Sequence, residues 1–258
     1  MLTPHTGLPL SLTLPAAAAS LAYLNARTQF SQDLELLSAS IIGGISTKRR
    51  INKKKTNQFH LLEEQALSSK TANKPFLVTP PEIPKNCTED TIRNLKPTEH
   101  TYRQTYDQVL KYSTWLKQEH GVKQNDVVAL DCTNKPLFVF IWFALWSLGA
   151  RPAFVNTSLR GESLLHCIKI SKCRLLLLDD QLEDALTTDM ATQLESVGVK
   201  PVLLDALLLT KVQSVSGRRP RDEEIGVPEP LDMCLLIFTS GTTVSLAKPA
   251  IKDAKLTT

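Results

Sequence analysis

The sequence is poor in cysteine, and none of its cysteines has the spacing of a metal site. Five cysteines occur in 258 residues, and no two of them stand as Cys-x-x-Cys. An odd number without such pairs argues against a disulfide framework and against a zinc finger. We therefore expect buried free thiols in a reducing compartment.

Glycine-rich nucleotide motifs are also missing. The chain has only 10 glycines, and no Gly-x-Gly-x-x-Gly follows a strand-like run. The Gly-x-x-x-x-Gly-Lys-Ser/Thr spacing of a Walker loop is absent as well. Both absences argue against a dinucleotide-binding domain and against a P-loop nucleotidase.

Positive charge is concentrated in one place, without aromatic residues around it. The formal net charge of +4 is mild, but KRRINKKK at 48–55 places six positive charges in eight residues. No aromatic side chain interleaves with this run to stack on bases, so no nucleic-acid partner is expected. Two interpretations remain: a solvated linker or exposed helix face, and attraction to an anionic membrane surface.

The N-terminal region contains a long uncharged segment. Residues 7–26 carry no charge, but prolines, serines and threonines interrupt the apolar residues. No basic residue precedes the segment, which argues against a secretory signal. We predict a membrane anchor or a membrane-lying helix, with a cleaved signal and a disordered tail as alternatives. The basic residues that follow would keep the main domain in the cytosol. This divides the chain into a targeting segment with a basic tether, 1–57, and a folded domain, 58–258.

The remainder alternates between helical and strand-like patterns. Residues 135–150 are apolar almost all round and too short to span a bilayer, so they predict a core helix. Their aromatic side chains leave an acyl pocket as a second interpretation. Residues 79–100 and 211–222 are expected to be loops. Alternating strands and helices predict an α/β fold with a mostly parallel sheet. Helices are predicted at 58–67, 101–121, 135–150, 160–171 and 182–197, and strands at 126–131, 151–156, 173–180 and 235–238.

A candidate phosphate-binding turn follows the last predicted strand. In parallel sheets, ligands bind at the carboxyl ends of strands. Hydroxyl groups, a flexible glycine and consecutive backbone N–H groups can surround phosphate oxygens there. An ordinary Ser/Thr-rich turn is the alternative. The turn consists of Thr239, Ser240, Gly241, Thr242 and Thr243.

The stretch FTSGTT resembles the phosphate-binding signature of the adenylate-forming (AMP-binding) superfamily. A longer stretch, NDVVALDCTNKPLFVFIWFALWSLGARPAFVNTSLRGESLLHCIKIS at 125–171, is similar to the fatty-acid transport protein and very-long-chain acyl-CoA synthetase family. The resemblance covers roughly residues 16–250. It implies the N-terminal part of the large adenylate-forming domain, with helices on both sides of the sheet.

The resemblance also implies a reaction. Enzymes of this family use ATP and Mg²⁺ to convert a fatty acid into an acyl-adenylate, and then transfer the acyl group to coenzyme A. Residues 239–243 would hold the ATP phosphates, and Lys248 is a candidate phosphate contact. The expected location is a membrane facing the cytosol, at the endoplasmic reticulum, peroxisome, lipid droplet or plasma membrane.

The turn departs from the family pattern immediately after Thr243. The family continues with Gly-Leu-Pro-Lys, whereas this chain has Val-Ser-Leu-Ala-Lys at 244–248. Either one residue is inserted and Lys248 is a displaced phosphate contact, or a short block is missing, which we favour. The family's enzymes continue for several hundred further residues. The expectation is therefore an N-terminal fragment of a ligase, inactive as given, and the alternative is a non-catalytic membrane-attached nucleotide-binding or interaction module.

Overall fold

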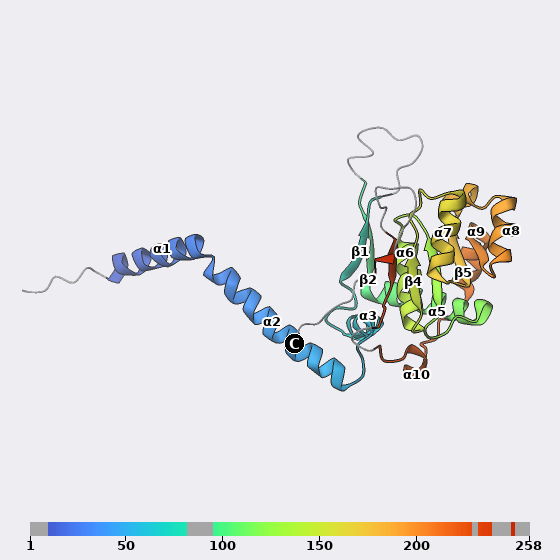
Figure 1. Ribbon diagram of the computed structural model, residues 1–258. Helices are drawn as coiled ribbons and strands as arrows, with labels where there is room; N and C mark the ends of the chain where they lie inside the picture. Colours follow the sequence, from blue (N-terminus) through green and yellow to red (C-terminus); the bar gives the residue numbers. More distant parts are fainter. Residues whose placement is uncertain (1–9, 82–94, 229–231, 239–248, 251–258) are drawn as a thin grey trace, which may run out of the picture. The chain divides into compact units, whose positions relative to one another are not determined.

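The computed structural model describes residues 10–81, 95–228, 232–238 and 249–250 (Figure 1). The chain divides into two compact units, residues 1–55 and residues 56–258. The division falls two residues before the boundary proposed from the sequence. Each unit is described by itself below.

The first unit consists of two helices, α1 (Leu10–Thr28) and α2 (Phe30–Asn52). They are separated at Gln29, whose φ of 54° is left-handed. Asn25 bridges the break, because its side chain accepts a hydrogen bond from the Ser31 backbone N–H at 2.8 Å. Helix α1 covers most of the uncharged segment 7–26, whereas α2 was not predicted. In the described part of the chain, no helix combines the length and apolar character needed to cross a bilayer.

The second unit is built on a six-stranded sheet with the order β6-β5-β3-β4-β7-β8. The first five strands in this order are parallel, and β8 runs antiparallel to β7. The prediction of a mostly parallel sheet is therefore confirmed. The strands are β3 (Val127–Asp131), β4 (Arg151–Phe154), β5 (Leu175–Asp179), β6 (Lys200–Leu204), β7 (Leu236–Phe238) and β8 (Pro249–Ala250).

Helices cover both faces of this sheet (Figure 1). Successive side chains of a strand point to opposite faces, and β5 shows the consequence. Leu175 and Leu177 belong to the core cluster that contains residues of α5 and α6. Leu176 and Leu178 belong to the cluster that contains residues of α7 and α8. The continuous leucine run at 175–178 is thus a strand buried on both sides, as parallel sheets require.

Most helices match the pattern of the sequence. Helix α5 begins with a capping box at Thr101 and ends at Gly121, which has the left-handed φ of 61° that favours glycine. The predicted helix 182–197 is divided in two, because the backbone leaves helical geometry at Leu186 and Thr187 caps a new helix. The helices are α3 (Gln58–Leu67), α5 (Tyr102–His120), α6 (Pro136–Ser147), α7 (Gly161–Ser171), η1 (Asp180–Ala185), α8 (Thr188–Ser196), α9 (Ala206–Ser214) and α10 (Asp222–Ile225).

Two predicted loops contain regular structure. Strand β2 (Thr98–Thr101) lies at the end of the predicted loop 79–100 and pairs antiparallel with β1 (Pro75–Thr79). Helix α9 extends into the predicted loop 211–222 as far as Ser214. The polar residues of β2 and of the end of α9 predicted loops. In both segments, tertiary contacts outweigh this local preference.

The thiols of the described residues are free. Cys132, Cys167 and Cys173 are buried, as expected, whereas Cys234 is exposed. Burial raises the pKa of the Cys132 thiol well above its ordinary value. Because the thiolate is the reactive form of cysteine, the buried Cys132 is expected to be unreactive. Cys87 lies outside the described residues.

Candidate functional site

The predicted phosphate-binding turn begins at the carboxyl edge of the parallel sheet. Strand β7 ends at Phe238, and its neighbour β4 pairs with it in parallel, with Phe154 opposite Ile237. Strand β8 returns to the same edge, because Pro249 pairs with Phe238. The ten residues between, 239–248, lie outside the described residues. The proposed contacts Thr239, Ser240, Gly241, Thr242, Thr243 and Lys248 therefore remain predictions.

A polar cluster occupies the described part of this edge. It is formed by Thr133 and Lys135, which follow β3, and by Asp179 and Asp180 at the end of β5. The Lys135 ammonium nitrogen lies 2.7 Å from Asp179 Oδ1 and 3.1 Å from Asp180 Oδ1. The Thr133 backbone N–H donates to Asp179 Oδ2 at 3.2 Å, and the Thr133 hydroxyl donates to the same oxygen. Asp179 is thus the centre of a closed set of polar contacts.

The electrostatics of Asp179 reflect these contacts. Its side chain is only 1% exposed. Burial acts to raise its pKa, but hydrogen bonding with Asp180, Lys135 and Thr133 outweighs burial and holds the pKa well below its ordinary value. Asp179 is therefore charged at neutral pH and holds Lys135 in place. The sequence offered no signal for this pairing, because residues 135 and 179 are far apart along the chain.

Asp131 is a further carboxylate of this edge, and it has no such partners in the part of the chain that the structure describes. It is the last residue of β3 and is fully buried. Neither carboxylate oxygen has a hydrogen-bond partner among the described residues. Burial raises its pKa to about 6; Arg160 opposes this shift, and Asp179 and Asp184 add to it. At neutral pH this side chain therefore carries a charge that its surroundings do not stabilise.

The two described cations near this edge, Lys135 and Arg160, are both paired with carboxylates. Lys135 is held by two carboxylates, and the Arg160 guanidinium contacts Asp184 at 3.1 Å. Neither cation is available to a phosphate without breaking an ion pair. In the described ranges, no group of histidine, cysteine or acidic side chains has the arrangement of a metal site.

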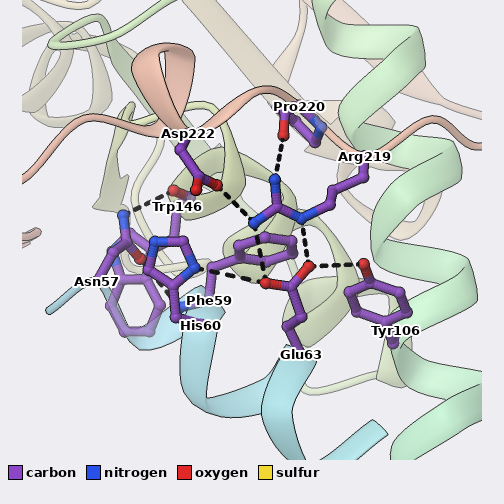
Figure 2. A network of polar contacts seen from close by, with 9 residues as sticks. All are labelled: Asn57, Phe59, His60, Glu63, Tyr106, Trp146, Arg219, Pro220 and Asp222. Atoms are coloured by element: carbon purple, nitrogen blue, oxygen red, sulfur yellow. Dashed lines mark hydrogen bonds and ion pairs between the residues drawn. The ribbon is translucent and has the colours of Figure 1, made fainter. Parts of the chain in front are cut away.

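A second polar network ties the α/β unit together near its beginning (Figure 2). Its centre is Glu63 of α3, which is 6% exposed. Tyr106 of α5 donates its hydroxyl to Glu63 Oε1 at 2.9 Å. Arg219 donates from Nε to Oε1 and from Nη2 to Oε2, the latter at 3.0 Å. The Arg219 guanidinium also donates to Asp222 at 2.6 Å and to the Pro220 carbonyl at 2.9 Å.

The network fixes the ionisation of its members. Burial works to raise the pKa of Glu63, but His60, Arg219 and Tyr106 outweigh burial and lower that pKa far below its usual range. Burial and the Glu63 carboxylate together raise the pKa of the Tyr106 phenol. Glu63 is therefore permanently charged and Tyr106 permanently neutral near pH 7. We assign this network a structural role, because it joins α3, α5 and the chain segment before α10.

Helix α6 combines a buried side and an aromatic side. Ile141, Ala144 and Leu145 are fully buried, which confirms the prediction of a core helix. On the other side Trp142 is the centre of an aromatic cluster, with ring centroids 5.9 Å from Phe138 and 5.0 Å from Trp146. These rings contact one another and Phe154 of β4. These ring contacts agree with a packing role for Phe138, Trp142 and Trp146, and the acyl pocket stays a prediction.

Comparisons with known proteins agree with this architecture. The sequence profile described as "AMP-binding enzyme" matches residues 63–245, more than half of the chain. The chain belongs to the AMP-binding enzyme family. Within that family its relatives include fatty acid transport proteins. It is 36% identical over 162 residues to the very long-chain fatty acid transport protein of Saccharomyces cerevisiae, covering 58% of this chain and 23% of that protein.

Two further relatives are similar over different lengths. The very long-chain fatty acid transport protein of Cochliobolus heterostrophus is 27% identical, covering 91% of this chain and 34% of that protein. A long-chain-fatty-acid-CoA ligase of Archaeoglobus fulgidus has the same fold, with a TM-score of 0.57 at 21% identity, over 72% of this chain and 35% of that one. The matched part of the chain thus spans between 23% and 35% of the length of these relatives.

Proposed function

We propose that this chain supplies the N-terminal part of a long- or very-long-chain fatty acyl-CoA synthetase. The observation that carries the proposal is the position of FTSGTT, which leaves the sheet at the end of β7 in a chain of the AMP-binding family. The relatives' names point to fatty acids as the substrate class. ATP, Mg²⁺ and coenzyme A are the co-reactants implied by the resemblance.

In this proposal the turn 239–243 positions the ATP phosphates. Its hydroxyl and N–H groups would neutralise charge on the pyrophosphate that leaves when the fatty-acid carboxylate attacks the α-phosphorus. The coenzyme A thiol would then displace AMP from the acyl-adenylate. Because the chain spans about a third or less of these relatives, this activity is proposed for a protein of family length. The 258-residue chain alone is expected to show no fatty-acid-dependent ATP–pyrophosphate exchange.

A chimera tests the role of the turn. The 258-residue chain is joined to the remaining portion of a relative, with Gly-Leu-Pro-Lys placed after Thr243. We expect fatty-acid-dependent exchange, and a loss of about 10²-fold when Thr239 and Ser240 are both replaced by alanine. Thr192→Ala, in the exposed face of α8, is the control and should leave exchange unchanged. Equal exchange by the double variant and the parent would contradict the proposed phosphate contact.

The sequence departure at 244–247 is tested with the same chimera. Keeping Val244-Ser245-Leu246-Ala247 should lower exchange by about 10²-fold, because a phosphate loop displaced by about 1 Å loses catalytic geometry. Retained binding of a fluorescent ATP analogue without exchange would favour the non-catalytic nucleotide-binding module instead. Equal turnover with either loop would show that the departure is harmless.

We further propose that residues 1–57 attach the protein to a membrane, with the α/β unit on the cytosolic side. The uncharged stretch at 7–26 and the basic residues at 48–55 support this attachment. The 258-residue chain expressed in cells should sediment with membranes, and a chain that begins at residue 58 should not. Equal distribution of the two would contradict the attachment. The endoplasmic reticulum, peroxisome, lipid droplet and plasma membrane are the candidate locations.

A further inference from the structure

Helix α2 presents an apolar stripe that nothing in its own unit covers. Leu34, Leu37, Ile41 and Ile45 follow one another at spacings of three and four residues, which places them on one side of a helix. Each of them is more than half exposed: 55%, 58%, 55% and 59%, respectively. Side chains of this kind in the α/β unit are mostly buried. A stripe of exposed leucine and isoleucine about three helical turns long is expected to have an apolar partner.

Charge along the same helix identifies the chemistry of that partner. Lys48, Arg49 and Arg50 lie at the C-terminal end of α2, and Lys53, Lys54 and Lys55 follow directly. Residues 30–55 carry these six positive charges and two negative ones, Asp33 and Glu35, a net charge of +4. A partner that offers both an apolar layer and dense negative charge fits this pattern. The interface of a bilayer with anionic lipids offers both.

Geometry argues against a spanning orientation for this helix. The stripe lies along one side, and the opposite side is mostly small or polar, with Ser40, Gly43 and Thr47 beside a single exposed leucine, Leu36. With 23 residues, α2 is about 35 Å long, so its whole length can lie along a membrane surface. No described helix has the apolar length required to cross a bilayer.

We propose that α2 lies flat in the headgroup region of an anionic membrane. Its stripe of Leu34, Leu37, Ile41 and Ile45 enters the acyl boundary, and the basic residues 48–55 contact lipid phosphates. This rests on the membrane attachment proposed above and deepens it, because it moves the main contact from the uncharged segment 7–26 to α2. It also makes attachment dependent on lipid charge.

Two leucines of α2 provide a matched test. Leu34 belongs to the stripe, whereas Leu36, 68% exposed, is rotated by about 200° around the helix axis. Leu34→Asp and Leu36→Asp change charge and helix propensity equally, and each follows an acidic residue. The 258-residue chain is floated with vesicles of phosphatidylcholine alone and of phosphatidylcholine mixed with phosphatidylserine. Leu34→Asp should lower partitioning by about tenfold or more, and Leu36→Asp by less than about twofold.

The contribution of charge is measured with the same vesicles. Replacing the six Lys and Arg residues of 48–55 with glutamine should abolish the preference for phosphatidylserine. The same preference should weaken for the parent chain as salt is raised, because surface charges are screened. A parent chain that binds neutral and anionic vesicles equally would overturn the proposal.

The other outcomes separate this inference from the attachment proposal. If both aspartate variants bind like the parent, α2 is not the contact, and attachment through 7–26 still stands. If the parent binds no vesicle, the inference and the membrane attachment both fail. If Leu34→Asp changes the oligomeric state in light scattering but not vesicle binding, the stripe faces a second copy of the chain and the inference is wrong.

Discussion

Leucine and isoleucine side chains are mostly buried in the second unit of the chain and mostly exposed in helix α2 of the first. In residues 56–258 the leucines of β5 and Leu145 of α6 are almost completely buried, whereas in residues 1–55 leucine and isoleucine side chains of α2 are more than half exposed. Both regions form helices from similar apolar spacing. The difference is that the second unit has a sheet against which its helices pack, and the first has none. Apolar periodicity therefore specifies a helix but does not specify what covers it.

The largest effect should come from removing a buried leucine side chain of the second unit, and an exposed leucine of α2 is the control. Leu145→Ala in α6 leaves a cavity at a fully buried position and should lower the free energy of unfolding by about 2–5 kcal/mol. Leu36→Ala in α2 should change it by less than about 0.5 kcal/mol. Urea unfolding followed by tryptophan fluorescence measures this, because all three tryptophans lie in the second unit. Similar losses of unfolding free energy in the two variants would contradict the difference between the two units.

The buried ion pair of the second unit should give the next largest effect. Glu63→Gln leaves Arg219 without its main partner, and we expect a loss of about 1–3 kcal/mol at pH 7. That range allows for the partial exposure of Arg219. Because the pKa of Glu63 is lowered on folding, its stabilisation is present above the ordinary glutamate pKa and is lost as pH falls below it. The parent should thus lose more stability than Glu63→Gln in urea titrations taken to low pH.

The contribution of Asp131 to stability should depend on pH in the opposite direction to that of Glu63. Its folded-state pKa is raised to about 6, so the free energy of unfolding should fall as pH rises from about 4 to about 6 and then level off. Asp131→Asn removes the buried charge and should stabilise the protein by about 1–2 kcal/mol at pH 7. The control is Asp126→Asn, at a carboxylate paired with Arg174 at 2.8 Å. Destabilisation by Asp131→Asn at pH 7 would show that the carboxylate has a partner.

The smallest effect concerns the exposed helix itself. Gly43 of α2 has open space where a Cβ would lie, with no atom within 4 Å. Gly43→Ala should therefore stabilise the helix by about 0.5–1 kcal/mol without changing the apolar stripe. Slower amide hydrogen exchange within α2, and unchanged exchange in α5, is the expected result. No change in α2 would mean that another contact already limits its opening.

Much of the second unit could be predicted from the sequence. The ranges predicted for α3, α5 and α7 agree with the structure to within one residue, and the leucine run at 175–178 lies in a strand, as predicted. The turn at 239–243 was placed from the end of the apolar run before it. In the first unit, α2 was not predicted, because serines and glycines interrupt its apolar residues. Its apolar stripe becomes clear only when the structure shows where the helix begins and ends.

The sequence by itself indicated the fold class and, through resemblance, the family, because apolar periodicity and short motifs are local features. The phosphate role of 239–243 stays a prediction. Only the tertiary structure decided that Lys135 pairs with Asp179, that Asp131 is buried without a hydrogen-bond partner among the described residues, and that Glu63 pairs with Arg219. These contacts join residues separated by more than 40 positions or depend on burial from every side. The local sequence pattern indicates neither the long-range contacts nor the burial, because contacts and burial arise only when the helices pack on the sheet.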